Sequence, residues 1–213
     1  MPDVRISDDR YSRERARMEL ALRFLRHEAR TQTIRAWTGL SDDRIRKLYR
    51  SYMSDARSDL RRHRGKSPHQ VAYFTRSLRL QEETAVLASV LSLLGVVPPA
   101  PASGAAANAA TSRTRGALTS AAPANASAGA SAGALPGLLR GELLCQAFEA
   151  FRVLLPSAHI SFEHAVFLAT ALARGDQLRL GGCADCGGLV VTERFRLRVP
   201  RCHRCAGRGQ ARC

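Results

Sequence analysis

Apolar side chains in the first hundred residues recur every three or four positions, which is the spacing of one face of an α-helix. A first helix is predicted by Met18, Leu22, Leu25 and Ala29. Two more are predicted, with a break at Gly39, by Ile34 to Trp37 and then by Ile45, Leu48, Tyr49 and Tyr52. A fourth, Leu78 to Leu94, is closed by Gly95 and stopped by Pro98 and Pro99. This part of the chain is therefore predicted to be helical.

The last third of the chain predicts two helices and then short strands. One helix runs from about Leu138 to Leu155 and is ended by Pro156. Ser161 can cap the next, which runs to about Arg174 and stops at Gly175. Their expected core residues are Phe148, Phe151, Phe162, Val166 and Phe167. The runs Leu189 to Thr192 and Phe195 to Val199 are β-prone and predict a hairpin.

Residues 98–137 interrupt this pattern with Ala, Gly, Ser, Pro, Thr and Asn. The stretch has no aromatic residue, and Leu118 and Leu135 are its only leucines. Such a composition cannot bury enough apolar area to offset its ordering entropy, so we interpret it as a flexible insertion. The predicted organisation is a helical DNA- and partner-binding region (1–97), the insertion (98–137), a helical pair (138–178) and a zinc module (179–213).

Charge points to an anionic partner. The chain has 33 Lys and Arg against 18 Asp and Glu, for a net charge of +15. Residues 1–97 hold 20 basic and 12 acidic residues, and residues 138–213 hold 11 basic and 6 acidic residues. Both ends are therefore expected to bind an anionic partner, with nucleic acid as the first candidate and a membrane surface as the second. The polar start and the short apolar run Ala85 to Val97 argue against a signal peptide or a membrane span. We therefore expect a cytoplasmic protein.

Four cysteines have the spacing of a zinc site. Cys183 and Cys186 form one Cys-x2-Cys pair, and Cys202 and Cys205 form another after 15 residues. In a reducing compartment this spacing favours metal over disulfides. Four thiolate ligands leave no open coordination position, so we expect one structural Zn²⁺. His203 is expected to be an exposed bystander, and Cys145 a core residue.

Residues 31–50 predict a helix-turn-helix. With Gly39 as the turn glycine, the buried positions are Ile34, Leu40, Ile45 and Leu48. Ser41 can cap the second helix, whose acidic start, Asp42 and Asp43, suits the helix dipole. That helix presents Arg44, Arg46, Lys47 and Arg50 as candidate DNA contacts. The alternative is a helical hairpin whose basic side chains only face solvent.

Given the helix-turn-helix pattern and the two cysteine pairs, the chain resembles the FlhC family. FlhC is a subunit of the bacterial flagellar master transcriptional activator. The resemblance lies in TGLSDDRIRKLYRSY, in AFEAFR at 147–152, and in ARGDQL at 173–178 leading to the two cysteine pairs. It covers residues 14–95 and 138–206, while the insertion and the short tail depart from it. The resemblance implies an all-helical protein with four zinc-ligating cysteines. It also implies a hetero-oligomer with an FlhD-like subunit, promoter DNA binding and recruitment of RNA polymerase.

The function expected from these patterns is a non-enzymatic, DNA-binding activator subunit. No Ser/His/Asp or paired-carboxylate set stands out, and a zinc deaminase would need an H-x-E element that the six histidines do not form. Two alternatives remain: an RNA-binding zinc-ribbon protein, and a basic assembly or scaffold protein. The apolar positions Leu78, Leu80, Val86, Val90, Leu93 and Leu94 predict some protein interface.

Replacing residues 100–134 with a short Gly/Ser bridge should leave both the melting temperature and DNA affinity nearly unchanged. Their composition cannot form a core, and closure entropy changes slowly with loop length. Thermal unfolding and DNA titration of the shortened chain measure both quantities. A large loss of either would show that the segment contributes contacts of its own.

Overall fold

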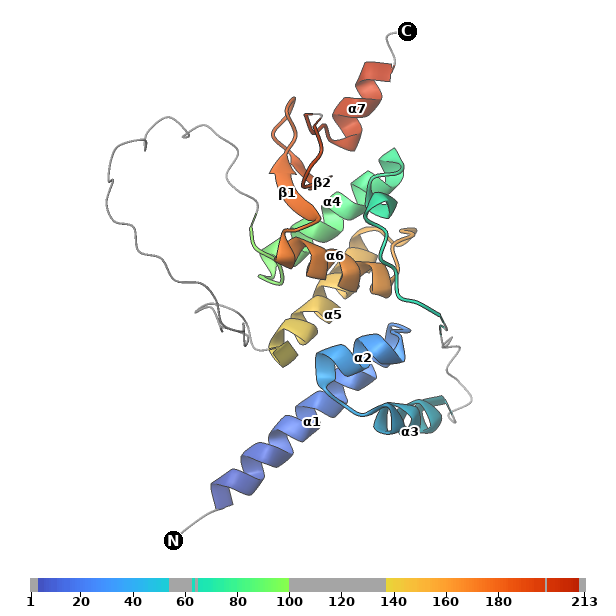
Figure 1. Ribbon diagram of the computed structural model, residues 1–213, viewed down its shortest axis with the longest axis vertical. Coiled ribbons are helices and arrows are strands. Elements are labelled where there is room, and N and C mark those ends of the chain that lie inside the picture. The colour runs from blue at the N-terminus through green and yellow to red at the C-terminus, as the bar shows by residue number, and fades with distance from the viewer. Residues whose placement is uncertain (1–3, 54–62, 64, 100–136, 198, 211–213) are drawn as a thin grey trace, which may run out of the picture.

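The computed structural model describes residues 4–53, 63, 65–99, 137–197 and 199–210, and most of the predicted insertion lies outside them. The protein is mainly helical, as predicted, with one small sheet (Figure 1). In chain order the elements are α1 (Val4–Arg26), α2 (Thr31–Thr38), α3 (Asp42–Met53), the 3₁₀ turn η1 (Val71–Phe74), α4 (Leu78–Leu93), α5 (Gly137–Leu154), α6 (Phe162–Arg174), β1 (Leu178–Gly182), β2 (Leu189–Glu193) and α7 (His203–Gln210). Among the described helices, none is both long and apolar enough to cross a bilayer.

Gly39, Gly175 and Ser161 end or begin helices where the sequence predicted. Gly39 follows α2 with φ 70°, and Gly175 follows α6 with φ 65°. Both adopt the left-handed conformation that glycine reaches without a Cβ clash. The Ser161 hydroxyl begins α6 by accepting the backbone N–H of His164. The predicted bounds of α4, α5 and α6 are confirmed to within about two residues.

Both sides of the insertion contribute to one hydrophobic core. Helix α1 packs on α5 so closely that a Cβ on Gly141 would lie 2.7 Å from Leu20 Cδ2. The ring of Phe24 meets that of Phe162 edge-on, with centroids 5.0 Å apart. The predicted core phenylalanines and valine are buried, except Phe167, which is half-buried. Residues far apart in the sequence, such as Phe24 and Phe162, therefore stabilise each other.

Helix α4 lies against α5, α6, α7 and β2. Its apolar residues predicted an interface with another protein, but the chain itself covers most of them. Leu80 is buried, and Val86, Val90 and Leu94 pack against the core. Leu78 and Leu93 remain exposed. The apolar excess of α4 reflects its position inside its own chain, so it does not indicate a partner-binding face.

A carboxylate from α6 holds the beginning of α2. Glu163 is 6% exposed and accepts the backbone N–H of Arg30 at 2.7 Å and the Thr33 hydroxyl at 3.0 Å. Arg30 precedes α2, where the first N–H groups of a helix have no partner within the helix. No side chain near Arg30 in sequence makes this cap, so α6 supplies it across 133 residues. The α2–Gly39–α3 segment is thereby tied to the shared core.

The sheet differs from the predicted hairpin. Strand β2 is where the sequence placed it, but it pairs antiparallel with β1, in the register Leu178↔Glu193 to Gly182↔Leu189. Residues 195–199 form no strand in the part that the structure describes, and Phe195, Leu197 and Val199 are exposed. Leu178 and Leu180 are both buried, so packing against the core favours β1 as the partner. The first cysteine pair therefore lies in the hairpin loop.

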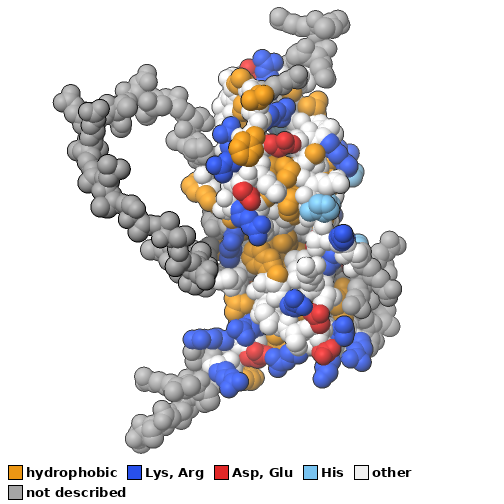
Figure 2. Space-filling view, in the orientation of Figure 1, with side chains coloured by type: hydrophobic (Ala, Val, Ile, Leu, Met, Phe, Trp, Pro, Cys, Tyr) orange, Lys and Arg blue, Asp and Glu red, His pale blue; other side chains and the backbone are white. Residues whose placement is uncertain are grey.

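The elements with candidate function lie at opposite ends of the molecule. Helices α1 to α3 occupy the N-terminal end of the long axis, and β1, β2 and α7 the other (Figure 1). Lys and Arg side chains are visible at both ends (Figure 2). Any basic surface on α3 is therefore separate from one beside the cysteines.

Glu163→Ala should loosen α2 without unfolding the chain. The change leaves the Arg30 N–H and the Thr33 hydroxyl without their acceptor, which costs about 1–3 kcal/mol. Denaturant unfolding and amide exchange at residues 30–34 measure the loss. Glu19→Ala, which removes an exposed carboxylate paired with Arg15 on α1, is the control and should cost under about 1 kcal/mol. Equal losses in both variants would show that the cap contributes nothing.

Candidate metal centre

The first cysteine pair is held by the turn between β1 and β2. The Cys183 N–H donates to the Gly188 carbonyl at 2.7 Å, and the Gly187 N–H donates to the Cys183 carbonyl at 2.8 Å. Gly187 has φ 71°, a conformation that residues with a Cβ rarely adopt. A Cβ on Gly188 would lie 3.4 Å from Cys186 Sγ. The two glycines thus let the chain turn tightly around the sulfurs of Cys183 and Cys186.

The second pair reaches the first through the end of the returning chain. The Ala184 N–H donates to the Pro200 carbonyl at 3.0 Å, and Arg201 pairs with Asp185 at 3.2 Å. These two contacts place Cys202 so that its N–H points at Cys183 Sγ, 3.2 Å away. Cys205 follows one turn into α7, and its N–H points at Cys202 Sγ, 3.5 Å away.

All four sulfur atoms lie within 4.8 Å of one another. Cys186 Sγ and Cys202 Sγ are 3.6 Å apart, too far for a disulfide bond of about 2.05 Å. Sulfurs bound tetrahedrally to one ion at about 2.3 Å lie about 3.8 Å apart, so the cluster has the right size for a metal. Cys183 and Cys202 are buried, and Cys186 is exposed. The described residues thus hold four free thiols that can bind one metal ion.

The thiols compete for protons because they are so close. Burial raises the pKa of Cys183, but backbone N–H groups of Cys202, Asp185 and Cys186 outweigh it and lower that pKa to about 6. Side-chain hydrogen bonds with Cys202 and Cys186 raise the pKa of Cys205 to about 12, and repulsion by a thiolate at Cys183 adds to this effect. The pKa of Cys186 is raised as well, although the Gly188 N–H acts to lower it. A divalent cation among the sulfurs would remove this repulsion and let all four ionise.

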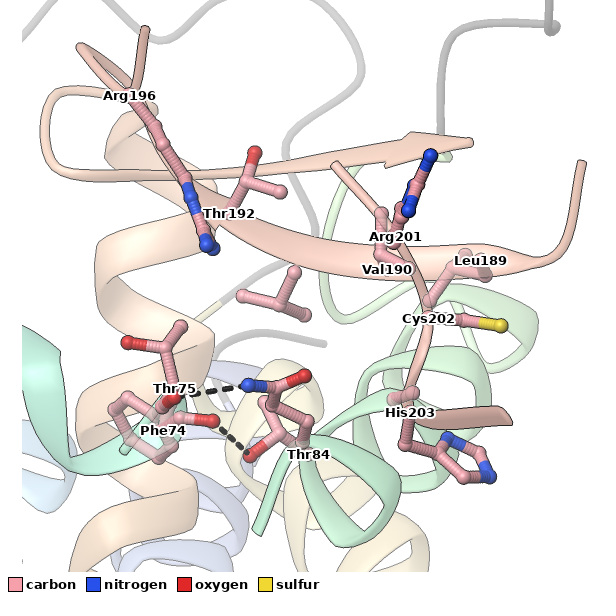
Figure 3. A pocket seen from close by; sticks show the side chains of 13 residues that line it. Phe74, Thr75, Thr84, Leu189, Val190, Thr192, Arg196, Arg201, Cys202 and His203 are labelled. Carbon is pink, nitrogen blue, oxygen red and sulfur yellow. Dashed lines mark hydrogen bonds between the residues drawn. The ribbon is translucent and has the colours of Figure 1, made fainter. Parts of the chain in front are cut away.

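The cysteine module packs on α4 through β2 and α7. His203 Nε2 lies 3.6 Å from Glu82 Oε1, and the side chain is only 22% exposed. His203 is therefore half-buried and not exposed as expected, because α7 turns it towards α4, and it is not part of the four-cysteine cluster. A small hollow of about 20 Å³ remains between Phe74, Thr84 and the module (Figure 3). It has room for a water molecule and no room for an organic substrate.

The other cysteine that the structure describes behaves as the sequence predicted. Cys145 on α5 is buried in the core and is not part of the four-sulfur cluster. Burial raises the pKa of its thiol to about 12, which makes it unreactive. Cys213 lies outside the described residues.

The four predicted DNA-contacting residues all lie exposed on α3, but in different surroundings. Arg44 pairs with Glu14 of α1, and Arg46 pairs with Asp43 at 3.0 Å. No described carboxylate pairs with Lys47 or Arg50. Sequence periodicity placed these side chains on the solvent face correctly. It could not show that Arg44 is tied to α1, since that contact spans 30 residues.

Cys183→Ser and Cys202→Ser should each release one bound metal ion per chain. Loss of a ligand breaks the coupling between metal binding and folding, so amide exchange should also rise across residues 178–207. Elemental analysis and exchange mass spectrometry measure the two effects. Cys145→Ala is the matched control and should keep the metal. A wild-type chain that purifies with no metal after reconstitution would contradict the assignment.

No family model matches this chain, and a search of the curated proteins finds no match. The resemblance to FlhC therefore rests on the chain's own residues. Those residues now have places in the fold. TGLSDDRIRKLYRSY runs from the end of α2 through α3, AFEAFR lies on α5, and the cysteines form a cluster that can bind a metal.

Proposed function

We propose that this protein is a non-enzymatic, duplex-DNA-binding transcriptional activator subunit that carries one structural zinc ion. The observation that carries the proposal is the exposed basic face of α3, which follows α2 after the tight turn at Gly39. Two helices joined in this way are the arrangement by which helix-turn-helix proteins present their second helix to the major groove.

Packing around the turn supports this interpretation. Ile34 and Ile45 are fully buried, and Leu40 between them is 2% exposed. Together they fix the angle between α2 and α3. Leu48 packs half-buried against the same core. The remaining side of α3 faces solvent, so it is free to approach a partner.

The ion pairs on α3 assign different tasks to its basic residues. Arg44 holds α3 against α1 through Glu14, so its part is partly structural. Lys47 and Arg50 have no carboxylate partner in the described part of the chain and are ready to neutralise phosphates. Arg46 has Asp43 as a partner, and both side chains are exposed. An exposed pair is weak and can open for a stronger ligand, so Arg46 is the candidate to contact a base.

Zinc is the metal that best suits four thiolates at this spacing, because soft sulfur ligands and tetrahedral geometry favour it. With Cys183, Cys186, Cys202 and Cys205 all bound, no position remains for water or substrate. The ion would then stabilise the module and take no part in a reaction. The hollow beside it, with room for a water molecule only, agrees with a structural role.

The biological setting of the proposal follows from the FlhC resemblance. By that resemblance the protein acts in the cytoplasm, joins an FlhD-like subunit, binds promoters of flagellar operons and recruits RNA polymerase. The shared core of α1, α4, α5 and α6 leaves some large apolar side chains exposed on these helices; among the described residues, Tyr11 on α1 and Leu139 on α5 are two of them. A partner subunit is expected to cover at least one of them.

An RNA-binding zinc protein is the nearest alternative, because the net charge and the cysteine spacing suit it equally well. The α2–Gly39–α3 geometry favours duplex DNA, since the deep, narrow major groove of RNA does not admit a helix. Competition between a promoter duplex and a structured RNA separates the two. A chain that binds neither would indicate an assembly protein.

Arg50→Ala should weaken binding to every duplex alike and lower the slope of log K against log salt by about one, because one phosphate contact is lost. Fluorescence anisotropy at several salt concentrations measures the slope. Arg174→Ala at the end of α6 removes another exposed arginine and should change nothing. The same slope in all three proteins would rule out α3 as a phosphate-binding helix.

Arg46→Ala should cost about 1–3 kcal/mol on the preferred site and reduce the preference among sequences, because a base contact is lost. Selection from a randomised duplex pool identifies the preferred site, and titration of single-base variants gives the loss. Asp43→Ala serves as the companion variant. It frees Arg46, so it should keep or increase affinity. A weaker Asp43→Ala protein with unchanged Arg46→Ala binding would contradict this role for Arg46.

A further inference from the structure

Three large apolar side chains extend into solvent between β2 and Cys202. Phe195 is 83% exposed, Leu197 is fully exposed, and Val199 is 68% exposed. Apolar side chains are visible at this end of the molecule beside Lys and Arg (Figure 2). Single exposed apolar residues are ordinary on protein surfaces, but three within five positions mark an interaction site.

Arg194 and Arg196 in this segment are exposed, and each also lies close to other parts of the protein. Arg194 donates to the Gly175 carbonyl at 2.8 Å, and its guanidinium lies 5.7 Å from the centroid of the Phe195 ring. The Arg196 side chain extends into the hollow above Thr75 (Figure 3). The three apolar side chains in this segment are left uncovered by the described part of the chain, so the fold presents them to a partner.

The surroundings of this apolar strip, defined as Phe195, Leu197 and Val199, are strongly basic. After Glu193 the sequence contains seven arginines and no acidic residue. Arg204 on α7 is exposed, and no carboxylate pairs with it or with Arg196 in the part of the chain that the structure describes. Arg201 is the exception, because Asp185 neutralises it. The partner must therefore offer both apolar surface and several negative charges.

A polyanion with flat apolar groups meets both needs. A second copy of this chain would bring two sets of arginines together, which like-charge repulsion opposes. Nucleic acid instead supplies phosphates for the arginines and base faces for the apolar side chains. DNA-binding proteins that insert Phe or Leu between base steps hold the adjacent backbone with arginine in this way.

We propose that the apolar strip is a second nucleic-acid contact, in which Phe195 and Leu197 press against bases while Arg196 and Arg204 bind neighbouring phosphates. The inference rests on the proposed function, since it assumes a duplex partner, but it involves a separate surface. Helix α3 lies at the opposite end of the molecule (Figure 1). Contacts at the two ends should therefore contribute independently and add in free energy.

The test uses the full-length, metal-loaded chain and mixed-sequence duplexes that contain 2-aminopurine, whose fluorescence rises when bases unstack. Wild-type protein should bind and raise the fluorescence at some position of the label. Phe195→Ala/Leu197→Ala should bind about 10-fold more weakly and give no rise, with an unchanged salt slope because no charge is lost. Arg196→Ala/Arg204→Ala should lower the slope by about two.

Val153→Ala/Leu154→Ala is the matched control, because it removes two exposed apolar side chains from the end of α5. It should behave like wild type, and metal content confirms that each variant is folded. If wild type binds but the Phe195/Leu197 variant binds and unstacks equally well, the strip is not a DNA contact. Loss of binding to phosphatidylserine vesicles in that variant, with duplex binding intact, would likewise overturn the proposal in favour of a lipid surface. A wild-type chain that binds no duplex would instead refute the proposed function.

Discussion

Four sulfur atoms within 4.8 Å of one another impose the constraint on which the C-terminal part of this protein depends. Backbone N–H groups lower the pKa of Cys183, whereas hydrogen bonds within the cluster raise the pKa of Cys205, so the four thiols do not ionise together. A cation bound between them would let all four ionise and would join the β1–β2 turn to α7. Because β2 and α7 also pack on α4, the metal centre is coupled to the helical core.

The helical core in turn fixes where the candidate DNA-binding surfaces lie. Glu163 ties the start of α2 to α6, and the buried residues around Gly39 set the direction of α3. A metal ion on the four cysteines would perform the same task at the other end, where it would anchor the segment that carries Phe195 and Leu197. Both surfaces are thus attached to rigid elements, which suits recognition of an extended partner such as a duplex.

Local patterns in the sequence predicted the local features of the fold. Helix bounds followed from Ser161, Gly39 and Gly175, whose effects act within one turn, and the metal centre followed from the spacing of two cysteine pairs. Long-range partners were not predictable: β1 was missed because Leu178-Arg-Leu-Gly-Gly is a weak strand signal that only packing against the core stabilises. The same limit applies to α4, whose apolar residues predicted a partner interface although the chain itself covers most of them. An apolar pattern in a single sequence predicts that a side chain is buried. Which element or partner buries it depends on long-range packing that the pattern does not specify.

X-ray absorption at the zinc edge of the reconstituted chain tests the central claim most directly, because it reports the ligands of the ion itself. We predict one shell of four sulfur atoms at about 2.3 Å. The spectrum should show no nitrogen or oxygen ligand, since His203 faces Glu82 and the hollow beside the cluster lies outside the set of four sulfurs. A mixed shell of sulfur with nitrogen or oxygen, or a chain that binds no zinc, would contradict a structural four-cysteine centre.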